Sequence, residues 1–201
     1  MFEYKHGNAV NHGLIQAIRQ HGLSIYRLVP GLNVLIPIQP EETLDAFQLN
    51  LFGCRPAQAE KLQQEGLLLT VARDPVEVCR SEPVDARWAT WSKQHPDMAS
   101  LTWVDAAAKL PASRLYQTSL GHALAAEDAQ LPVERRLAHL RLAFTDLETA
   151  TQTRPQSAAR WFSFARVSMA LGQRQHSVHC LQKINDLVVQ ARGIYRLVLD
   201  E

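Results

Sequence analysis

Cysteine is scarce in this sequence, and the few present are not arranged for a disulfide framework or a metal site. No Cys-x-x-Cys pair occurs, and no group of cysteines and histidines has zinc-ligand spacing. His176 and His179 are one helical turn apart but have no evident third ligand, so we predict surface histidines. The sequence predicts no metal site and favours buried or idle thiols in a reducing compartment. The three cysteines are Cys54, Cys79 and Cys180.

Long apolar runs and an excess of charge are also lacking. No apolar stretch approaches the ~18 residues that a membrane span needs. The N-terminal MFEYKHG has no basic segment followed by an apolar one, as a secretory signal would. Charged residues make up 20% of the chain and the formal net charge is +1, so no strong field attracts nucleic acid or an anionic membrane. We therefore expect a cytoplasmic protein that binds neither nucleic acid nor membrane.

Residues 1–55 alternate between strand and helix patterns. Apolar residues recur at helical spacing after residue 10, and Gly22 is placed to cap the end of this helix. In SIYRLVPGLNVLIPI, β-branched and aliphatic residues flank Pro30-Gly31, which predicts two strands or one strand broken at a turn. A third apolar stretch, FQLNLFG, has alternating polarity and favours a strand. Its apolar positions are Phe47, Leu49 and Leu51.

Residues 56–112 are predicted to form a mixed, mostly helical connector that packs between the two ends of the chain. Pro56 followed by AQAEKLQQEG resembles a helix with proline in its first turn and glycine at its end. Trp88 and Trp91 lie one helical turn apart, which predicts either a packing seam or an aromatic site for a ligand or partner. The seam is favoured because large aromatic side chains dominate cores and interfaces.

Residues 113–201 are predicted to be helical. Gly172 and a short polar turn separate the last two apolar stripes, which predicts an antiparallel helical hairpin. The residues of each stripe recur at helical spacing. The stripes are Leu137, Leu140, Phe144 and Leu147; Trp161, Phe164, Ala165 and Ser168; and Val178, Leu181, Ile184 and Val188.

The hairpin fits the ~34-residue period of a tetratricopeptide repeat, which it resembles. In this register Leu120-Gly121 lies about ten residues too early, so we expect the stretch AEDAQLP to form a longer loop. At most two units are visible and about three are needed for stability, so we expect the helices to lean on the α/β part or on a second copy of the chain. The residues assigned to packing or turn positions are Trp161, Phe164, Ala165, Gly172, Leu181 and Ile184.

The order of MFEYKHGN, GLIQAIRQHGLSIYRLVPGL and FQLNLFG resembles the end of an FkbM-family methyltransferase domain. In that family an acidic late strand precedes a helix, then a Gly-x-x-Ile/Val-Tyr-Arg strand and an Asn-bearing last strand. The resemblance covers residues 1–55. It implies the C-terminal edge of a Rossmann-like sheet that is mostly parallel with an antiparallel last strand. The expected fold is therefore an α/β remnant of that methyltransferase sheet (1–55), a connector (56–112) and an all-α TPR-like region (113–201).

The resemblance also implies S-adenosylmethionine as the cofactor of the complete enzyme, and a sugar or natural-product hydroxyl as its substrate. A glycine-rich turn and an acidic residue on the early strands should hold this cofactor. The nine glycines here are isolated and form no Gly-x-Gly, so we expect no cofactor to bind this chain alone. Methyl transfer requires the nucleophile to be aligned with the methyl group. We therefore expect activity only with a missing N-terminal segment or a separate polypeptide.

Four polar residues in this region are substrate-binding candidates: Glu3, Lys5, His6 and Asn50. Glu3 lies where the family's late strand delivers side chains to the cleft, so it is either a base or substrate contact or an exposed carboxylate at a strand end. Lys5 and His6 either meet a hydroxylated substrate or are solvated. Asn50 either hydrogen-bonds neighbouring backbone, which is favoured, or contacts substrate.

Two functions stay open at this point. The first is an incomplete FkbM-type methyltransferase. The second is a non-enzymatic interaction or scaffold module in which the helical tail is the functional part. The tail forms either a partner groove or a lid or dimerisation element, and the latter is favoured because two repeat units form little concave surface. An exposed sheet edge, where further strands would pair, adds to the expectation of a homodimer.

Overall fold

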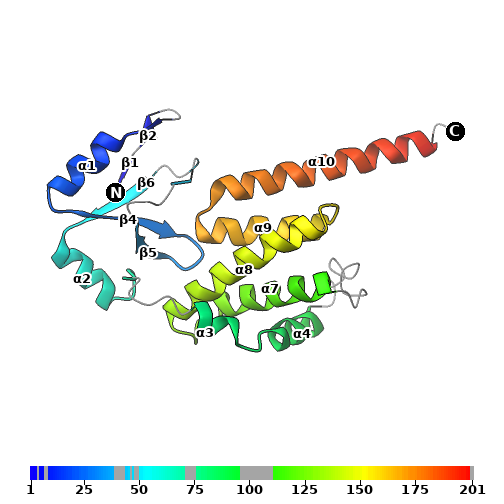
Figure 1. Cartoon of the computed structure of the whole chain (residues 1–201), viewed down its shortest axis with the longest axis horizontal. Helices are drawn as coiled ribbons and strands as arrows, with labels where there is room; N and C mark the ends of the chain where they lie inside the picture. The colour runs from blue at the N-terminus through cyan, green and yellow to red at the C-terminus, as the bar shows by residue number, and fades with distance from the viewer. Residues whose placement is uncertain are drawn as a thin grey trace.

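In a computed structural model, a small sheet flanked by two helices adjoins a stack of longer helices (Figure 1). The structure describes residues 1–3, 5–6, 9–38, 44–45, 47, 50–70, 76–95 and 111–199, with the backbone alone for 5–6, 9–10, 92, 111–113 and 191–199. The protein is thus mixed α/β with a helical C-terminal region, as its sequence predicts. No helix in these ranges is long and apolar enough to cross a membrane.

Four strands form the main sheet, and every neighbouring pair in it is antiparallel. Their spatial order is β1-β6-β4-β5, and a separate two-stranded sheet pairs β2 with β3. The strands are β1 (Phe2–Glu3), β2 (Lys5–His6), β3 (Ala9–Val10), β4 (Ser24–Val29), β5 (Val34–Pro37) and β6 (Asn50–Cys54).

The predicted turn at Pro30-Gly31 separates β4 from β5, so the alternative of two strands is confirmed. Asn33 closes the turn with a positive φ of 54°, a conformation that asparagine tolerates better than most residues. The predicted strand at FQLNLFG begins later than expected, at Asn50. Phe47 precedes it and is 47% exposed, whereas Leu51 is fully buried. Leu49 lies outside the described residues.

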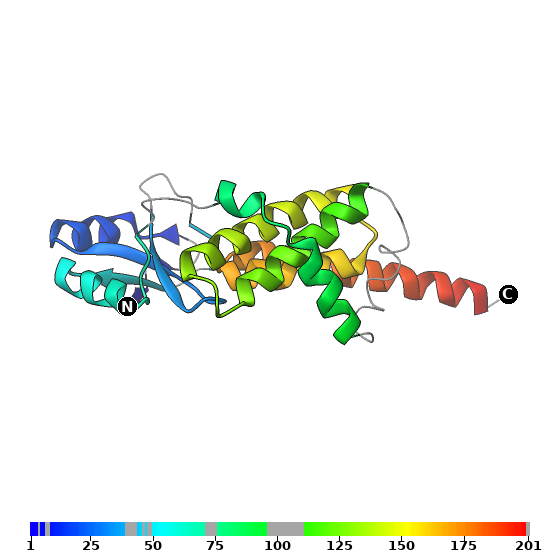
Figure 2. The same cartoon turned by 90° about the horizontal axis from the view of Figure 1, so that it is seen from below.

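Helices α1 (His12–Gln20) and α2 (Pro56–Gln64) flank the sheet on opposite sides (Figure 2). Because successive strand residues point to opposite faces, Ile25 packs with Ile15 and Ile18 of α1, while Tyr26 packs with Ala59 and Leu62 of α2. Gly22 follows the end of α1 with φ 75°, as the sequence predicts, and at the start of the helix the Asn11 side chain accepts from Leu14 N at 2.9 Å.

The described part of the connector divides between the two ends of the chain. Helix α2 packs on the sheet, whereas α3 (Val76–Arg80) and α4 (Asp85–Gln94) pack on the long helices. The reason is apolar burial, since Cys79 and Val76 contact Ala138 and Leu142 of the helical region.

Within residues 111–199, four helices stack in successive layers (Figure 1). They are α7 (Pro111–Glu127), α8 (Val133–Thr153), α9 (Ala158–Leu171) and α10 (Arg174–Leu199). The predicted loop at AEDAQLP is shorter than expected, because α7 continues to Glu127. Leu120-Gly121 lies inside α7. Gly172 ends α9 with φ 80°, as predicted for the hairpin.

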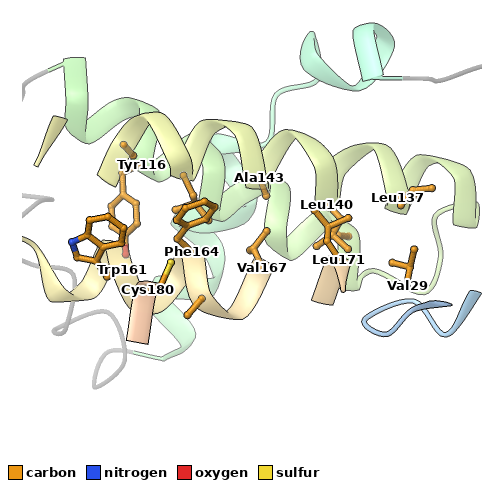
Figure 3. Packing of buried hydrophobic residues seen from close by; sticks show 14 of the residues in the cluster. Val29, Tyr116, Leu137, Leu140, Ala143, Trp161, Phe164, Val167, Leu171 and Cys180 are labelled. Atoms are coloured by element: carbon orange, nitrogen blue, oxygen red, sulfur yellow. The ribbon is translucent and has the colours of Figure 1, made fainter. Parts of the chain in front are cut away.

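The largest apolar core lies between these helices (Figure 3). Residues of α8 such as Leu140 and Ala143 face Phe164 and Leu171 of α9, and Phe144 lies 5.1 Å from Phe164 between ring centroids. The sheet joins the same core, because Val29 of β4 packs beside Leu137 (Figure 3). The first two predicted stripes are thus core-forming.

The tip of the β4–β5 hairpin rests on the turn between α9 and α10. Gly31 N donates to Ala170 O at 2.8 Å, and Arg27 Nη1 donates to Leu171 O at 3.1 Å. A Cβ on Gly31 would lie 2.6 Å from Ala170 Cβ, so only glycine fits there. The helices thus lean on the α/β part, one of the two supports expected for them.

Candidate functional site

The structure brings two of the four substrate-binding candidates together. Glu3 of β1 and Asn50 of β6 are directly opposite across the antiparallel pair, and both are exposed. Opposite residues of such a pair project from the same face of the sheet. Lys5 and His6 form β2, whose partners are Val10 and Ala9 of β3. Their side chains lie outside the description, so a substrate-binding role for them stays a prediction.

Six residues are assigned to packing or turn positions of the repeat. Four of them are buried at 8% exposure or less (Trp161, Phe164, Ala165 and Ile184), and Gly172 forms the turn. Leu181 differs from them, because it is 51% exposed. Helix α10 instead turns Ser177, Cys180 and Ile184 inward, and a residue next to Cys180 points about 100° away from it.

A cluster that the sequence analysis did not find lies where α3, α7 and α8 meet. We refer to it as the polar cluster; its residues are Cys79, Glu82, His122, Arg135 and His139. The side chains of Cys79, His122 and His139 are buried, at 0%, 2% and 0% exposure, and that of Glu82 is 23% exposed. Buried polar groups of this kind are costly unless they interact. The buried members of the polar cluster are therefore expected to interact with one another.

Local structure places each of these side chains. Cys79 is carried by α3 and packs on Ala138 and Leu142 of α8. The chain turns directly after α3, and Glu82 N donates to Cys79 O at 3.2 Å, which holds the carboxylate beside the thiol. Arg135 and His139 are one turn apart on α8, so both reach the same side.

Donor atoms converge at the centre of the polar cluster. Three possible ligand atoms lie within 4.8 Å of one another, one each from Cys79, Glu82 and His139. His139 Nε2 is 3.4 Å from Glu82 Oε2 but has no hydrogen-bond partner, and it is fully buried. The other carboxylate oxygen, Glu82 Oε1, accepts from Arg135 Nη2 in a close ion pair.

The second nitrogen of His139 is held by a second histidine. His139 Nδ1 lies 3.0 Å from His122 Nδ1, so one imidazole donates and the other accepts. Burial lowers the pKa of both rings, that of His122 to about 4, which leaves both neutral at pH 7. A neutral pair is consistent with this contact, because two protonated rings have no acceptor nitrogen.

Charge in the polar cluster is balanced between one acid and one base. Burial has the largest effect on Glu82 and opposes its ionisation, but the hydrogen bonds from Arg135 and Cys79 and the nearby positive charge together outweigh it and lower the pKa of the carboxyl. Burial raises the pKa of the Cys79 thiol, with the Glu82 charge adding to the effect. At neutral pH the cluster therefore holds a thiol, two neutral imidazoles and one carboxylate–guanidinium pair.

This arrangement does not suit a nucleophilic cysteine. A reactive thiol needs access and a lowered pKa, whereas Cys79 is fully buried and its pKa is raised. A relay also needs the acid on the nitrogen opposite the thiol. Here Glu82 faces Nε2 of His139 at 3.4 Å, and the opposite nitrogen, Nδ1, contacts His122 rather than the thiol. Convergence of three donor atoms on one point is instead the geometry of metal coordination.

The sequence contains only weak signals that predict the polar cluster. Cys79 and Glu82 are three residues apart, and Arg135 and His139 four apart, spacings that are common without function. The spacing of cysteines and histidines alone does not reveal a mixed set of side chains that includes a carboxylate. Folding joins positions separated by 56 residues in the contact of Cys79 Sγ with Arg135 O.

A second feature is the outer face of α10. Val178, Leu181, Asn185 and Val188 follow one another at spacings of three, four and three residues, on the flank next to the face packed on α9. Leu181 and Val188 are 51% and 42% exposed, and Asn185 is exposed. The first three also line a shallow groove, together with Gln182 and Asp186.

Comparison with protein-family models, with curated proteins and with solved structures finds no match to this chain.

Proposed function

We propose that residues 1–55 form the C-terminal edge of an FkbM-type, S-adenosylmethionine-dependent methyltransferase, which in its complete form methylates a hydroxyl of a sugar or natural product. The observation that carries the proposal is the direction of three strands. Both β1 and β4 run antiparallel to β6, which lies between them, so β1 and β4 run parallel to each other. A mostly parallel sheet with an antiparallel last strand has this pattern.

The connection between the parallel strands also supports the proposal. Parallel strands require a crossover, which is usually a helix, and α1 lies between β1 and β4 in the sequence. Among the described residues, β1 pairs with β6 alone, so its other edge is open to a further strand. Addition of parallel strands at that edge would supply the glycine-rich turn that this sequence lacks.

Glu3 and Asn50 are the substrate-binding residues in this proposal, because they share one face at the open side of the sheet. Lys5 and His6, which form β2 in the separate two-stranded sheet, are the other two candidates. If Glu3 is the base that takes the hydroxyl proton, Glu3→Gln lowers kcat of the complete enzyme by about 10²–10⁴-fold. A change confined to KM would instead make Glu3 a substrate contact.

The test is to reconstitute the sheet. The polypeptide encoded immediately upstream of this chain is co-expressed with it, and S-adenosylmethionine binding is measured by calorimetry for the complex and for the chain alone. We expect binding by the complex and none by the chain. Tight binding by the chain alone would refute the claim that its cofactor site is incomplete. The methyltransferase assignment would be refuted by an upstream sequence without a glycine-rich segment, or by a complex that binds no cofactor.

A second candidate function is protein interaction through the TPR-like tail, with a second copy of the chain as the partner. The observation that favours it is the outer seam of α10, namely Val178, Leu181, Asn185 and Val188. Their spacing is that of the a and d positions of a coiled coil, in which two helices pack along one apolar seam. A single asparagine at an a position fixes register and favours a defined oligomer. Asn185 occupies that position.

The length of α10 fits the same role. Its 26 residues extend about 39 Å, whereas the 14 residues of α9 extend about 21 Å. Helix α10 consequently projects past α9 (Figure 1). The end of a helical stack is normally closed by a polar face, whereas this one presents apolar side chains, which a second copy would cover.

The oligomeric state tests this candidate. Light scattering at micromolar concentration should give a dimer for the wild type and a monomer for Leu181→Asp, because a buried charge at the seam is unpaired. Met169→Asp is the matched control, since Met169 is 50% exposed on α9 and outside the seam; it should remain dimeric. Asn185→Leu should tighten the association and loosen its register. A monomeric wild type, or equal effects of the two aspartates, would exclude the seam.

A further inference from the structure

We propose that Cys79, Glu82 and His139 form a binding site for a divalent transition-metal ion, with Zn²⁺ as the ion that the donor set favours. A thiolate sulfur, an imidazole nitrogen and a carboxylate oxygen are the ligands that Zn²⁺ takes in proteins. Harder ions such as Mg²⁺ and Ca²⁺ prefer oxygen alone. The site is independent of the proposed methyltransferase sheet, because all three ligands lie on or beside α3 and α8.

The spacing of the donor atoms suits a tetrahedral ion. Zinc bonds of ~2.0–2.3 Å at tetrahedral angles place neighbouring ligand atoms roughly 3.3–3.8 Å apart. His139 Nε2 and Glu82 Oε2 are already 3.4 Å apart, and all three ligand atoms are within 4.8 Å of one another. Because no two of these atoms are more than 4.8 Å apart, a movement of at most about 1 Å brings them to tetrahedral spacing.

An independent observation points to a ligand at the same place. His139 Nε2 is a buried polar atom without a hydrogen-bond partner and lies 3.4 Å from Glu82 Oε2, and Cys79 offers a third ligand atom within 4.8 Å in the same group. Such atoms are rare in folded proteins and often mark a place for an ion or water. A metal ion bonded to Nε2 would satisfy it.

His122 completes the site as a positioning residue. A histidine ligand usually donates its second ring N–H to a neighbouring acceptor, which fixes its tautomer and orientation. With the metal on Nε2, His139 donates from Nδ1 to His122 Nδ1 across their 3.0 Å contact. His122 accepts this hydrogen bond in its neutral form with the proton on Nε2.

The charges around the site limit its affinity without preventing binding. Arg135 occupies only Glu82 Oε1 and leaves Oε2 for the metal. The guanidinium repels a dication, but it also keeps the carboxylate ionised and oriented. Binding displaces the thiol proton of Cys79 to solvent, so each ion bound releases one proton and affinity rises with pH. Three protein ligands leave a fourth position for water.

The test uses Co²⁺ as a spectroscopic probe and Zn²⁺ as its competitor. Titration of the metal-free chain should produce a cobalt–thiolate absorption band that saturates at one ion per chain and is abolished by Zn²⁺. Cys79→Ser should remove the band and weaken zinc binding by more than 100-fold. Cys54→Ser, which alters a buried thiol in the sheet, should retain both. His122→Leu should weaken zinc binding by about 10–100-fold, and His122→Gln, which keeps an acceptor, should restore it.

X-ray absorption of the zinc-loaded wild type gives a readout that no folding defect of a variant can affect. We expect one sulfur at about 2.3 Å and nitrogen or oxygen at about 2.0–2.2 Å. A spectrum without sulfur would overturn the site and point to surface histidines such as His176 and His179. The site would equally be excluded by a wild type with no thiolate band at saturating Co²⁺, or by unchanged zinc affinity in Cys79→Ser.

Discussion

Replacing Gly121 by alanine tests how closely α4 and α7 approach each other. A Cβ at this position would lie 2.4 Å from Val84 O and 2.8 Å from Val84 C, both backbone atoms. Ordinary contact begins near 3.4 Å, so the two helices must separate by about 1 Å (3.4 minus 2.4). Val84 O also accepts the first hydrogen bond of α4, from Arg87 N at 3.0 Å. The carbonyl therefore cannot turn away without disrupting the start of α4.

The expected cost follows from two opposing terms. Overpacking a well-packed contact costs about 1–3 kcal/mol, and a backbone contact with no freedom to rotate belongs at the upper end. Exchange of glycine for alanine inside a helix returns about 1 kcal/mol. Gly121→Ala should therefore lower the free energy of unfolding by about 2 kcal/mol.

Urea denaturation followed by circular dichroism measures this change, and Gly13→Ala is the matched control. Gly13 is also helical, but a Cβ there meets its nearest neighbour at an ordinary 3.5 Å. That variant should be more stable than the wild type by a few tenths to about 1 kcal/mol. If Gly121→Ala gains stability as Gly13→Ala does, the close approach of α4 and α7 is refuted.

Three further outcomes follow from glycine geometry, core packing and buried charge. Gly172→Ala should cost more stability than Gly66→Ala in denaturation, because both have positive φ but only Gly172 has a neighbour, Leu28 O, within 3.2 Å of the added Cβ. Leu147→Ala, at a fully buried position, should cost about 2–5 kcal/mol, whereas Leu181→Ala should change the stability of the monomer by no more than about 0.5 kcal/mol. Burial raises the pKa of the Asp146 carboxyl above its unfolded value near 3.8, so the ionised carboxylate lowers the free energy of unfolding at neutral pH. Asp146→Asn should therefore be more stable than the wild type at pH 7. This difference in stability should vanish as the pH falls below 3.8.

Much of the local structure was readable from the sequence because short-range stereochemistry decides it. Gly22 and Gly172 end helices because glycine adopts positive φ at little cost. Pro30 lies at a turn between two strands because proline fixes its own φ and lacks a ladder donor. The stripe of Leu137, Leu140 and Leu147 marks the buried face of a helix that has neighbours on one side.

Tertiary contacts decided the rest. Two apolar flanks are available on α10, and its fit against α9 buried Cys180 and Ile184 while leaving Leu181 exposed. Periodicity alone cannot select between flanks that differ by one residue, because that choice depends on the partner surface. The polar cluster depends still more on the fold, since Cys79, His122 and His139 come from three elements and meet only when α3 and α7 pack on α8. The sequence thus determined local turns and helix ends such as those at Pro30, Gly22 and Gly172, and long-range packing determined which side chains share a buried site.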